Sequence, residues 1–186
     1  MIITYDEFDY KWLMDLPQQK RKQGNQSTSQ KYYYKDLITA FDIETTYIEE
    51  IDQSVMYIWQ WQFGDKCTVI GRTWYELRIF FENLKEHLLD DRLVIFVHNL
   101  SFEFQFLSGV FHFAPDDVFC MDHRKVLKAL YSDTFEFRCS YIHSNMNLRS
   151  FCEKMHVHNY KLKYNYKKRR YWYTELSPRE IAYCIN

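Results

Sequence analysis

Two short apolar runs, each followed directly by polar residues, constrain the fold of this chain most. Residues 37–41 lead into Asp42 and Glu44, and residues 93–97 lead into residues 98–103. Continuous apolar runs of this length are typical of strands buried inside a sheet. The segments between and after them have apolar residues at helical spacing, and strands interleaved with helices form a sheet covered by helices. We therefore predict an α/β fold with a mixed β-sheet flanked by helices.

The remaining pattern predicts the other elements of this fold. Residues 54–63 partly alternate between apolar and polar, and residues 66–71 follow after Gly64 and Asp65, which predicts a β-hairpin. Thr73 is a candidate N-cap for a helix with the apolar face Leu77, Phe80, Phe81, Leu84 and Leu88. Further strands are predicted at 118–121, 126–131 and 135–140, and further helices at 101–107, at 147–155 and from Ser177.

The chain length of 186 residues fits one domain with a sizeable core. Residues 1–36 differ in composition from the rest and are predicted to form an N-terminal arm. Within this arm, residues 18–31 are polar and contain no large apolar side chain, so we expect a flexible loop there. The aromatic and apolar residues at positions 5–14 are expected to dock the arm onto the domain formed by residues 37–186.

The charge composition indicates that any attraction for nucleic acid comes from a local basic patch and not from the net charge of the chain. The formal net charge is −1, so affinity for nucleic acid requires a local basic patch. Residues 167–170 are such a patch, and the aromatic residues 171–173 follow it, which suits phosphate contact and base stacking. A solvated loop is the alternative interpretation. Aromatic residues make up 19% of the chain, and most of these rings are expected in the core.

Cysteine usage and hydropathy indicate the compartment. The five cysteines are scattered and include no C-x-x-C pair, which is typical of reduced thiols and not of a disulfide framework or a zinc site. The chain opens without a charged and then apolar leader, and no apolar stretch reaches the roughly 20 residues that a membrane span requires. We expect a soluble, cytoplasmic protein that does not interact with membranes.

The polar residues that follow the two apolar runs suit a metal site. Asp42 and Glu44 lie two positions apart in a strand, so their carboxylates share one face and can converge on a hard cation. Asn99 and Glu103 follow the second run and add an amide and a third carboxylate. A solvated strand end is the alternative for Asp42 and Glu44 taken alone, but the second segment favours a metal site.

These residues also carry a family resemblance. Asp42-Ile43-Glu44, followed by His98-Asn99-Leu100 with Phe102 and Glu103, resembles the first two exonuclease motifs of protein-primed family B phage DNA polymerases. The resemblance covers the chain from about residue 37 to its end. It implies an RNase H-like 3′-5′ proofreading exonuclease domain in which four carboxylates hold two divalent ions, Mg²⁺ or Mn²⁺.

The chain differs from this family pattern at two places. The second motif of the family has Asp at the position of Glu103. Because the side chain of Glu103 is longer than that of Asp, coordination of the metal through water is favoured. The third motif begins at Tyr183, and the fourth carboxylate would follow Asn186 directly. The resemblance therefore implies a domain that is truncated before its last catalytic acid, with impaired activity in this fragment.

The resemblance implies a catalytic role for five residues. Asp42, Glu44 and Glu103 would hold the metal ions, with Asp42 as the bridging ligand. Lys161 would contact the scissile phosphate, and Tyr183 would orient the attacking water.

The resemblance further implies contacts with the 3′ end of a single-stranded primer. These DNA-binding residues would be Thr45, His98, Asn99, Phe102, Phe106, Ser140 and Tyr166. Asn99 would donate a hydrogen bond and Phe102 would stack on a base, whereas a turn amide and a core ring are the alternatives. A structural histidine is the alternative for His98, and Ser140 corresponds to a family contact with the primer and the terminal protein.

Three functions are compatible with these residues. The first is the exonuclease domain of a protein-primed polymerase, with single-stranded DNA, a terminal protein and a polymerase domain as partners in the cytoplasm of a bacterial host. The second is a non-cleaving module of the same fold that binds single-stranded DNA or terminal protein. The third is another RNase H-like nuclease that acts on RNA or structured DNA.

Overall fold

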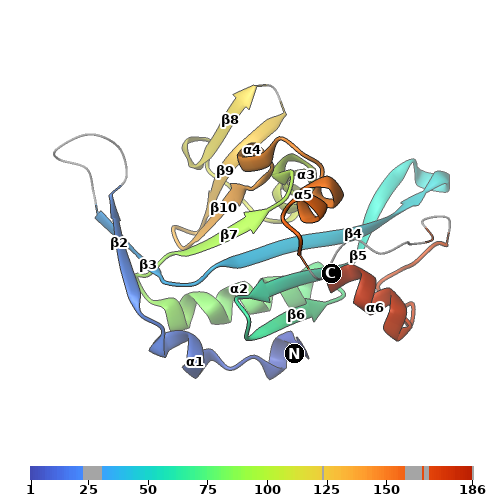
Figure 1. Ribbon diagram of the computed structural model, residues 1–186. Coiled ribbons are helices and arrows are strands. Elements are labelled where there is room, and N and C mark those ends of the chain that lie inside the picture. The colour runs from blue at the N-terminus through green and yellow to red at the C-terminus, as the bar shows by residue number, and fades with distance from the viewer. Residues whose placement is uncertain (23–30, 123, 158–164, 166–167, 186) are drawn as a thin grey trace.

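A mixed sheet of eight strands forms the centre of the computed structural model, which describes residues 1–22, 31–122, 124–157, 165 and 168–185. The strand order is β1-β6-β5-β4-β7-β10-β9-β8. The strands are β1 (Ile2–Thr4), β4 (Thr39–Ile48), β5 (Gln53–Phe63), β6 (Cys67–Gly71), β7 (Leu93–Val97), β8 (Val118–Asp122), β9 (Lys125–Tyr131) and β10 (Phe135–Cys139). The predicted mixed α/β sheet is confirmed (Figure 1).

Strand direction changes four times across this sheet. Strand β4 pairs antiparallel with β5 and parallel with β7, and β7 pairs parallel with β10. The predicted hairpin is confirmed, because β5 and β6 are antiparallel. Strands β10, β9 and β8 continue as an antiparallel meander to the far edge.

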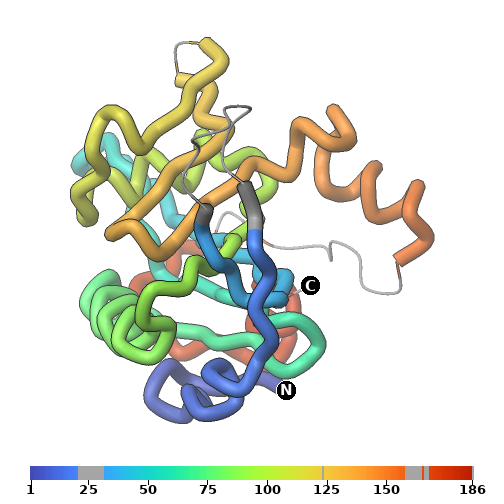
Figure 2. Tube along the Cα trace, turned by 90° about the vertical axis from the view of Figure 1, so that its left-hand side faces the viewer, coloured from blue at the N-terminus to red at the C-terminus, as the bar shows by residue number. Residues whose placement is uncertain are grey.

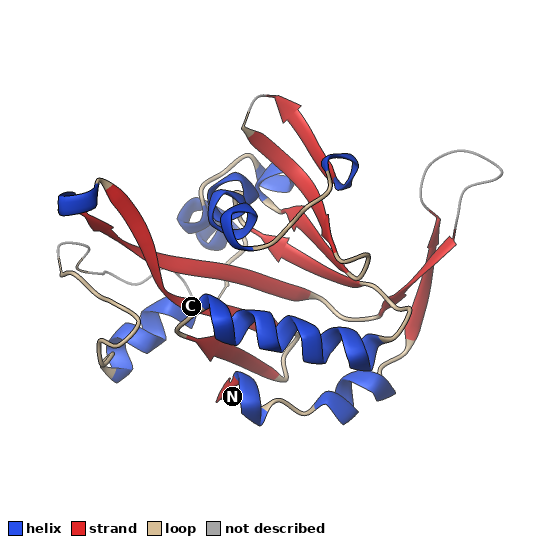
Figure 3. Cartoon of the chain, turned by 180° about the vertical axis from the view of Figure 1, so that it is seen from behind, coloured by secondary structure: helices blue, strands red, loops and turns tan. Residues whose placement is uncertain are grey.

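Helices cover both faces of the sheet. They are α1 (Tyr10–Asp15), α2 (Trp74–Leu88), α3 (Leu100–Val110), α4 (Tyr141–Ser144), α5 (Leu148–Lys154) and α6 (Pro178–Ile185). Short 3-10 turns lie at Tyr5–Glu7, Glu49–Ile51 and Pro115–Asp117. Helices α1 and α2 lie side by side on one face (Figure 3), whereas α4 and α5 lie on the other side of the sheet (Figure 2).

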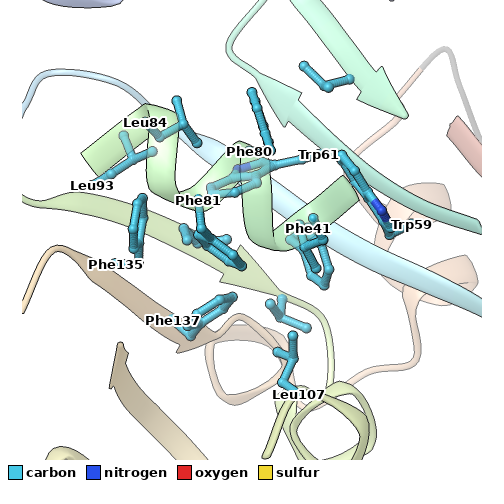
Figure 4. Packing of buried hydrophobic residues seen from close by; sticks show 14 of the residues in the cluster. Phe41, Trp59, Trp61, Phe80, Phe81, Leu84, Leu93, Leu107, Phe135 and Phe137 are labelled. Atoms are coloured by element: carbon cyan, nitrogen blue, oxygen red, sulfur yellow. The ribbon is translucent and has the colours of Figure 1, made fainter. Parts of the chain in front are cut away.

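The core lies between α2 and the sheet. The apolar stripe of α2 is the predicted one, and its five residues are all buried. The predicted N-cap is also confirmed, because the Thr73 side chain accepts a hydrogen bond from the Glu76 backbone amide and Glu76 reciprocates in a capping box. Phe81 contacts Phe135 of β10 edge to face at 4.7 Å, and Phe80 stacks on Trp59 of β5 at 5.9 Å (Figure 4).

The N-terminal arm belongs to this same sheet and core. Strand β1 pairs parallel with β6, and Phe8 and Leu13 are buried in the core beside α2. The expected docking of the arm is therefore confirmed. Apolar burial of these side chains provides the stabilisation that the polar part of the arm lacks.

The polar stretch predicted as a loop over 18–31 begins as a strand. Strand β2 (Gln18–Lys22) pairs antiparallel with β3 (Lys31–Lys35), and residues 23–30 lie outside the described part of the chain. Polar contacts hold this hairpin: the Gln18 amide donates to the Asp91 carboxylate at 2.8 and 3.0 Å, and Lys35 forms an ion pair with Asp91 at 3.3 Å. Composition missed these strands because their stabilisation is polar.

Among the residues that the structure describes, no helix is both long enough and apolar enough to cross a bilayer.

Candidate active site

Two of the three predicted metal ligands meet where strands β4 and β7 separate. Strand β4 pairs with β7 at Thr39 and Ala40, and Asp42 lies just beyond this paired segment. Glu103 lies on the first turn of α3, the helix that follows β7, and its side chain is hydrogen-bonded to Asp42. The fold thus brings together two acids that are separated in the chain by β5, β6, α2 and β7.

The environment of Glu103 fits a cation. Glu103 is only 3% exposed, and its Oε2 atom is buried without a hydrogen-bond partner. Burial, and then the neighbouring charge of Asp42 and the hydrogen bond with it, raise the pKa of the Glu103 carboxyl well above its usual value. Two adjacent carboxyl groups with an unsatisfied oxygen are a donor set that a divalent ion satisfies. In the described part of the chain, no group of three or more potential ligands is gathered for an ion.

Gln60 is a site residue that sequence analysis missed. It lies on β5 directly opposite Asp42, and its Nε2 donates to Asp42 Oδ2 at 2.9 Å. Gln60 is 5% exposed, and its Oε1 is buried without a partner. Only the strand register reveals this contact, because no sequence motif around Gln60 indicates that its side chain would bind Asp42.

Glu44 and Thr45 lie at an irregularity of the same strand. Glu44 is half-buried on the face of β4 that carries Asp42, and the register between β4 and β5 shifts between Glu44 and Thr45. The thiol of Cys184 on α6 faces both acids: burial, and then the charges of Glu44 and Asp42, raise the pKa of Cys184 to about 12. Helix α6 therefore lies beside Asp42 and Glu44, which are inside β4 and not at the strand end that the sequence predicted, because β4 continues to Ile48 in its pairing with β5.

Tyr183 also lies on α6, but its ring is buried. It is 5% exposed and packs in a small cluster with Tyr57, Ile58, Leu176 and Cys184. The capping box predicted at the start of this helix is confirmed, because the Ser177 hydroxyl donates to Glu180 Oε2 at 2.8 Å and the Ser177 backbone amide donates to the same oxygen at 2.9 Å.

A cavity of about 870 Å³ opens beside Asp42. Its floor comes from the sheet and its walls from α6 and from the segment of α4 and α5. The lining residues are Ala40, Phe41, Asp42, Gln60, Gln62, Thr68, Phe96, His98, Asn99, Ser140, Tyr141, Asn147, Leu148, Cys184 and Ile185. A cavity of this volume accommodates a nucleotide-sized ligand.

His98 is held on both ring nitrogens. Its Nδ1 lies 3.2 Å from Ser140 Oγ, and its Nε2 lies 3.1 Å from the Met146 carbonyl oxygen. Burial lowers the pKa of His98, although the hydrogen bond to Met146 acts in the opposite direction. A neutral ring with its proton on Nε2 satisfies both contacts. These contacts favour the structural interpretation of His98, and they also fix Ser140 in the cavity wall.

Asn99, Phe102 and Phe106 lie at the start of α3. Asn99 is exposed, lines the cavity and has a left-handed backbone with φ of 69°, a conformation that asparagine tolerates. Phe102 is 40% exposed, and its ring lies 5.4 Å from that of Phe106 one helical turn away. The pair presents an aromatic surface beside the site.

The remaining predicted residues are placed differently or not described. Lys161 and Tyr166 lie outside the described residues. The predicted basic patch does not present free cations where it is described. Lys168 and Arg170 both pair with Glu180 at 2.8 Å, and Arg169 pairs with Glu50 at 2.6 Å. Arg170 is 3% exposed, so its ion pair with Glu180 joins it to α6 in the interior.

Comparisons with known proteins agree with this fold. A family model described as 3′-5′ exonuclease matches residues 21–186, and no curated protein sequence matches the chain. The fold resembles phi29 DNA polymerase complexed with single-stranded DNA, with a TM-score of 0.63 and 14% identity, over 80% of this chain and 28% of that one. The ternary complex of phi29 DNA polymerase with primer-template DNA and incoming nucleotide substrates gives the same values. The chain thus spans about 28% of the length of these polymerases. Because the family model matches most of its length, the chain belongs to the 3′-5′ exonuclease family.

Proposed function

We propose that the chain is the proofreading exonuclease domain of a protein-primed DNA polymerase and removes nucleotides from single-stranded 3′ ends. The contact between Asp42, which lines the cavity, and Glu103 carries this proposal. Two carboxyl groups in contact beside a nucleotide-sized cavity suit metal-dependent phosphodiester hydrolysis.

Each side chain of the site has a distinct part in this reaction. Asp42, Glu44 and Glu103 would hold two divalent ions, Mg²⁺ or Mn²⁺. The bound ions supply Lewis acidity and lower the pKa of water. Gln60 holds the Asp42 carboxylate in one orientation through its hydrogen bond of 2.9 Å. Tyr183 is proposed to act on the attacking water, and Lys161 on the scissile phosphate.

The substrate contacts come from the walls of the cavity. Asn99 lines the cavity, and Ser140 lies in its wall. Asn99 and Ser140 would contact the terminal nucleotides of the strand together with Thr45 and Tyr166, and His98 would position Ser140 through its contact of 3.2 Å. The exposed edge of Phe102 and its neighbour Phe106 suit stacking against a base.

Partners follow from the same proposal. The polymerases with a similar fold were solved with single-stranded and with primer-template DNA, which supports DNA as the substrate here. A polymerase domain and a terminal protein are the further partners we propose. The site of action would be the cytoplasm of a bacterial host, if the protein is encoded by a phage.

The experiment measures the direction of cleavage along the strand and its dependence on divalent metal ions. The chain is incubated with 5′-labelled single-stranded DNA and Mg²⁺ or Mn²⁺, and the products are separated on a gel. We expect a ladder that shortens from the 3′ end, and no ladder with Asp42→Ala. A parallel RNA substrate tests the sugar preference. Cleavage that is unchanged in Asp42→Ala would contradict the proposal.

A second function has one observation in its favour. In the described residues no group of three potential metal ligands is gathered, whereas the cavity and its lining residues Asn99 and Ser140 are present. A non-cleaving module that binds single-stranded DNA or terminal protein would have these properties. It predicts that the chain retains an oligonucleotide in a filter-binding assay and yields no ladder with either metal.

A further inference from the structure

A row of side chains crosses the sheet and begins at the cavity. Ala40 of β4 pairs with Phe96 of β7, and Phe96 pairs with Arg138 of β10. Arg138 pairs in turn with Lys128 of β9, and Lys128 pairs with Phe119 of β8. Residues that are directly paired on neighbouring strands point to the same face of a sheet. These five residues therefore form one line, which we call the cross-sheet row.

The cross-sheet row lies on the face of the sheet away from α2. The neighbouring residues Phe41, Ile95 and Phe137 point to the opposite face and are buried in the core. Ala40 and Phe96 line the same cavity as Asp42, so the row starts at the candidate active site. In Figure 2, α2 and the segment with α4 and α5 lie on opposite sides of the sheet. Because the row lies on the face away from α2, it is on the side of α4 and α5.

The outer members of the row are open to solvent. Lys128 and Arg138 are 31% and 33% exposed, and Phe119 on the edge strand is 62% exposed. The row thus places two cations, Arg138 and Lys128, between two aromatic rings, Phe96 and Phe119. Aromatic rings for bases and cations for phosphates are the combination that binds single-stranded nucleic acid without reading its sequence.

A buried carboxylate holds the two cations in place. Glu136 is fully buried, and its Oε2 lies 3.3 Å from Lys128 Nζ and accepts a hydrogen bond from the Tyr34 hydroxyl at 2.8 Å. Arg138 Nε donates to Glu136 Oε1 at 2.6 Å. Burial raises the pKa of Glu136, but Tyr34, Arg138 and Lys128 together lower it below its usual value, so Glu136 is ionised. Two cations face one anion, which leaves a net positive charge at the surface.

We infer that the cross-sheet row binds the single strand behind its 3′ terminus, with phosphates on Arg138 and Lys128 and bases on Phe96 and Phe119. This inference rests on the proposed function, because it places the terminal nucleotide in the cavity. Neighbouring strands lie about 4.8 Å apart, so Lys128 lies about 14 Å from Ala40 across three strand spacings. At about 3.4 Å for each stacked nucleotide, this distance corresponds to about four nucleotides.

The test compares binding of short and long oligonucleotides in the absence of divalent ions, so that no cleavage occurs. Lys128→Gln removes one cation and leaves Arg138 to neutralise Glu136. We expect it to weaken binding of a dT ten-mer about three- to tenfold, to reduce the salt dependence, and to leave a dinucleotide unaffected. Glu136→Gln frees both cations and should tighten binding of the ten-mer. Lys11→Gln on α1, beside α2, is the control and should change nothing.

Opposite outcomes of the two substitutions separate a binding role from a structural one. If Lys128→Gln and Glu136→Gln weaken the ten-mer equally, or if both leave it unchanged, the inference is wrong and the row belongs to packing or to a protein contact. Degradation assays keep the two proposals apart. Suppose that the wild-type protein cleaves, that Asp42→Ala does not cleave, and that Lys128→Gln binds the ten-mer as wild type does. The proposed function is then supported, and the inference that the cross-sheet row binds the strand is wrong.

Discussion

At the scale of single residues, the candidate site depends on one carboxyl group that is buried before any ion is bound. Glu103 has an unsatisfied Oε2 beside Asp42, and its pKa is raised by burial and by Asp42. A proton on Glu103 relieves the repulsion between the two groups in the metal-free protein. A divalent ion would replace that proton, so metal binding is expected to strengthen as pH rises.

The first prediction concerns Glu103→Gln in metal-free buffer. Between the ordinary pKa of 4.5 and the raised value, the folded protein retains a proton that the unfolded chain releases, so the free energy of unfolding falls as pH rises. The variant lacks the Glu103 carboxyl group, so this contribution to the pH dependence is absent. From about pH 5 to about pH 9 we expect wild type to lose stability relative to the variant, by on the order of 1 kcal/mol for each pH unit at most.

Urea unfolding at several pH values measures this difference. Glu86→Gln, an exposed position on α2, is the control and should follow wild type throughout. A parallel pH dependence for wild type and Glu103→Gln would show that Glu103 is not protonated in the folded protein.

The second prediction concerns Gln60→Ala. Loss of the hydrogen bond to Asp42 leaves its carboxylate free to rotate, and loss of such a supporting contact lowers metal affinity about 10- to 100-fold. Half-saturation of activity should therefore require more Mn²⁺. Gln62→Ala is the matched control, since Gln62 lines the same cavity but bonds to Gly64 and Thr68. Equal shifts in both variants would point to general loosening of β5.

At the scale of elements, the sequence predicted those that have a local signal. The helix after Thr73 was predicted from an N-cap and an apolar stripe, and the helix after Ser177 from a capping box; both caps are present. The hairpin of β2 and β3 was missed because its polar side chains pair with distant residues such as Asp91. In the described part of the basic patch, the counter-charges of Lys168, Arg169 and Arg170 lie on other elements, which composition alone does not reveal.

The third prediction concerns Glu180, which ties α6 to the segment before it. Hydrogen bonds from Lys168, and then from the Ser177 amide, lower the pKa of Glu180 far below 4.5. Glu180→Gln leaves Arg170 buried without its counter-charge and should cost about 2–4 kcal/mol at neutral pH. A group with a lowered pKa loses its contribution as pH falls, so the two proteins should converge on acidification below about pH 4.

Thermal unfolding of both proteins at neutral and acid pH provides the measurement. Glu153→Gln on α5 is exposed and serves as control. A stability difference that is independent of pH would show that Glu180 acts through its shape and not through its charge.

The fourth prediction compares two glycines. An added Cβ at Gly71 would collide with the indole ring of Trp59, which is fully buried beside it. Gly71→Ala should therefore destabilise the protein by about 1–3 kcal/mol. At Gly109 on α3 an added Cβ meets no atom within 4 Å. Gly109→Ala should stabilise the helix by up to about 1 kcal/mol. Chemical denaturation of both variants tests the pair, and similar effects at both positions would contradict it.

At the scale of the whole molecule, the sequence predicted the class of fold and the two acids that meet. Asp42 and Glu103 were predicted as ligands from the motifs, and the sheet places them in contact. The contact of Gln60 with Asp42 and the alignment of the cross-sheet row were not predictable from the sequence, because both depend on the register between strands. Tyr183 follows its motif in sequence, yet its burial against Tyr57 and Ile58 is a property of the packing of α6.

The fifth prediction concerns the end of α6. A polypeptide that ends at Asn186 contains three of the four acids that the family resemblance implies. We expect that an extension with an aspartate directly after Asn186, followed by residues that complete the helix, increases the rate of 3′-5′ degradation at least tenfold, because an added ligand strengthens metal binding. Single-turnover degradation of both polypeptides gives the comparison, and an extension with alanine in place of aspartate is the control.

The separation of β4 from β7 after Ala40 has a consequence for folding kinetics. Asp42 and Glu103 are separated in the chain by β5, β6, α2 and β7, so their contact closes a long loop. Closing a long loop costs chain entropy, and we expect this contact to form late in folding. Divalent ions should then slow unfolding and leave the refolding rate almost unchanged, which makes ion binding a reporter of the final stage of folding.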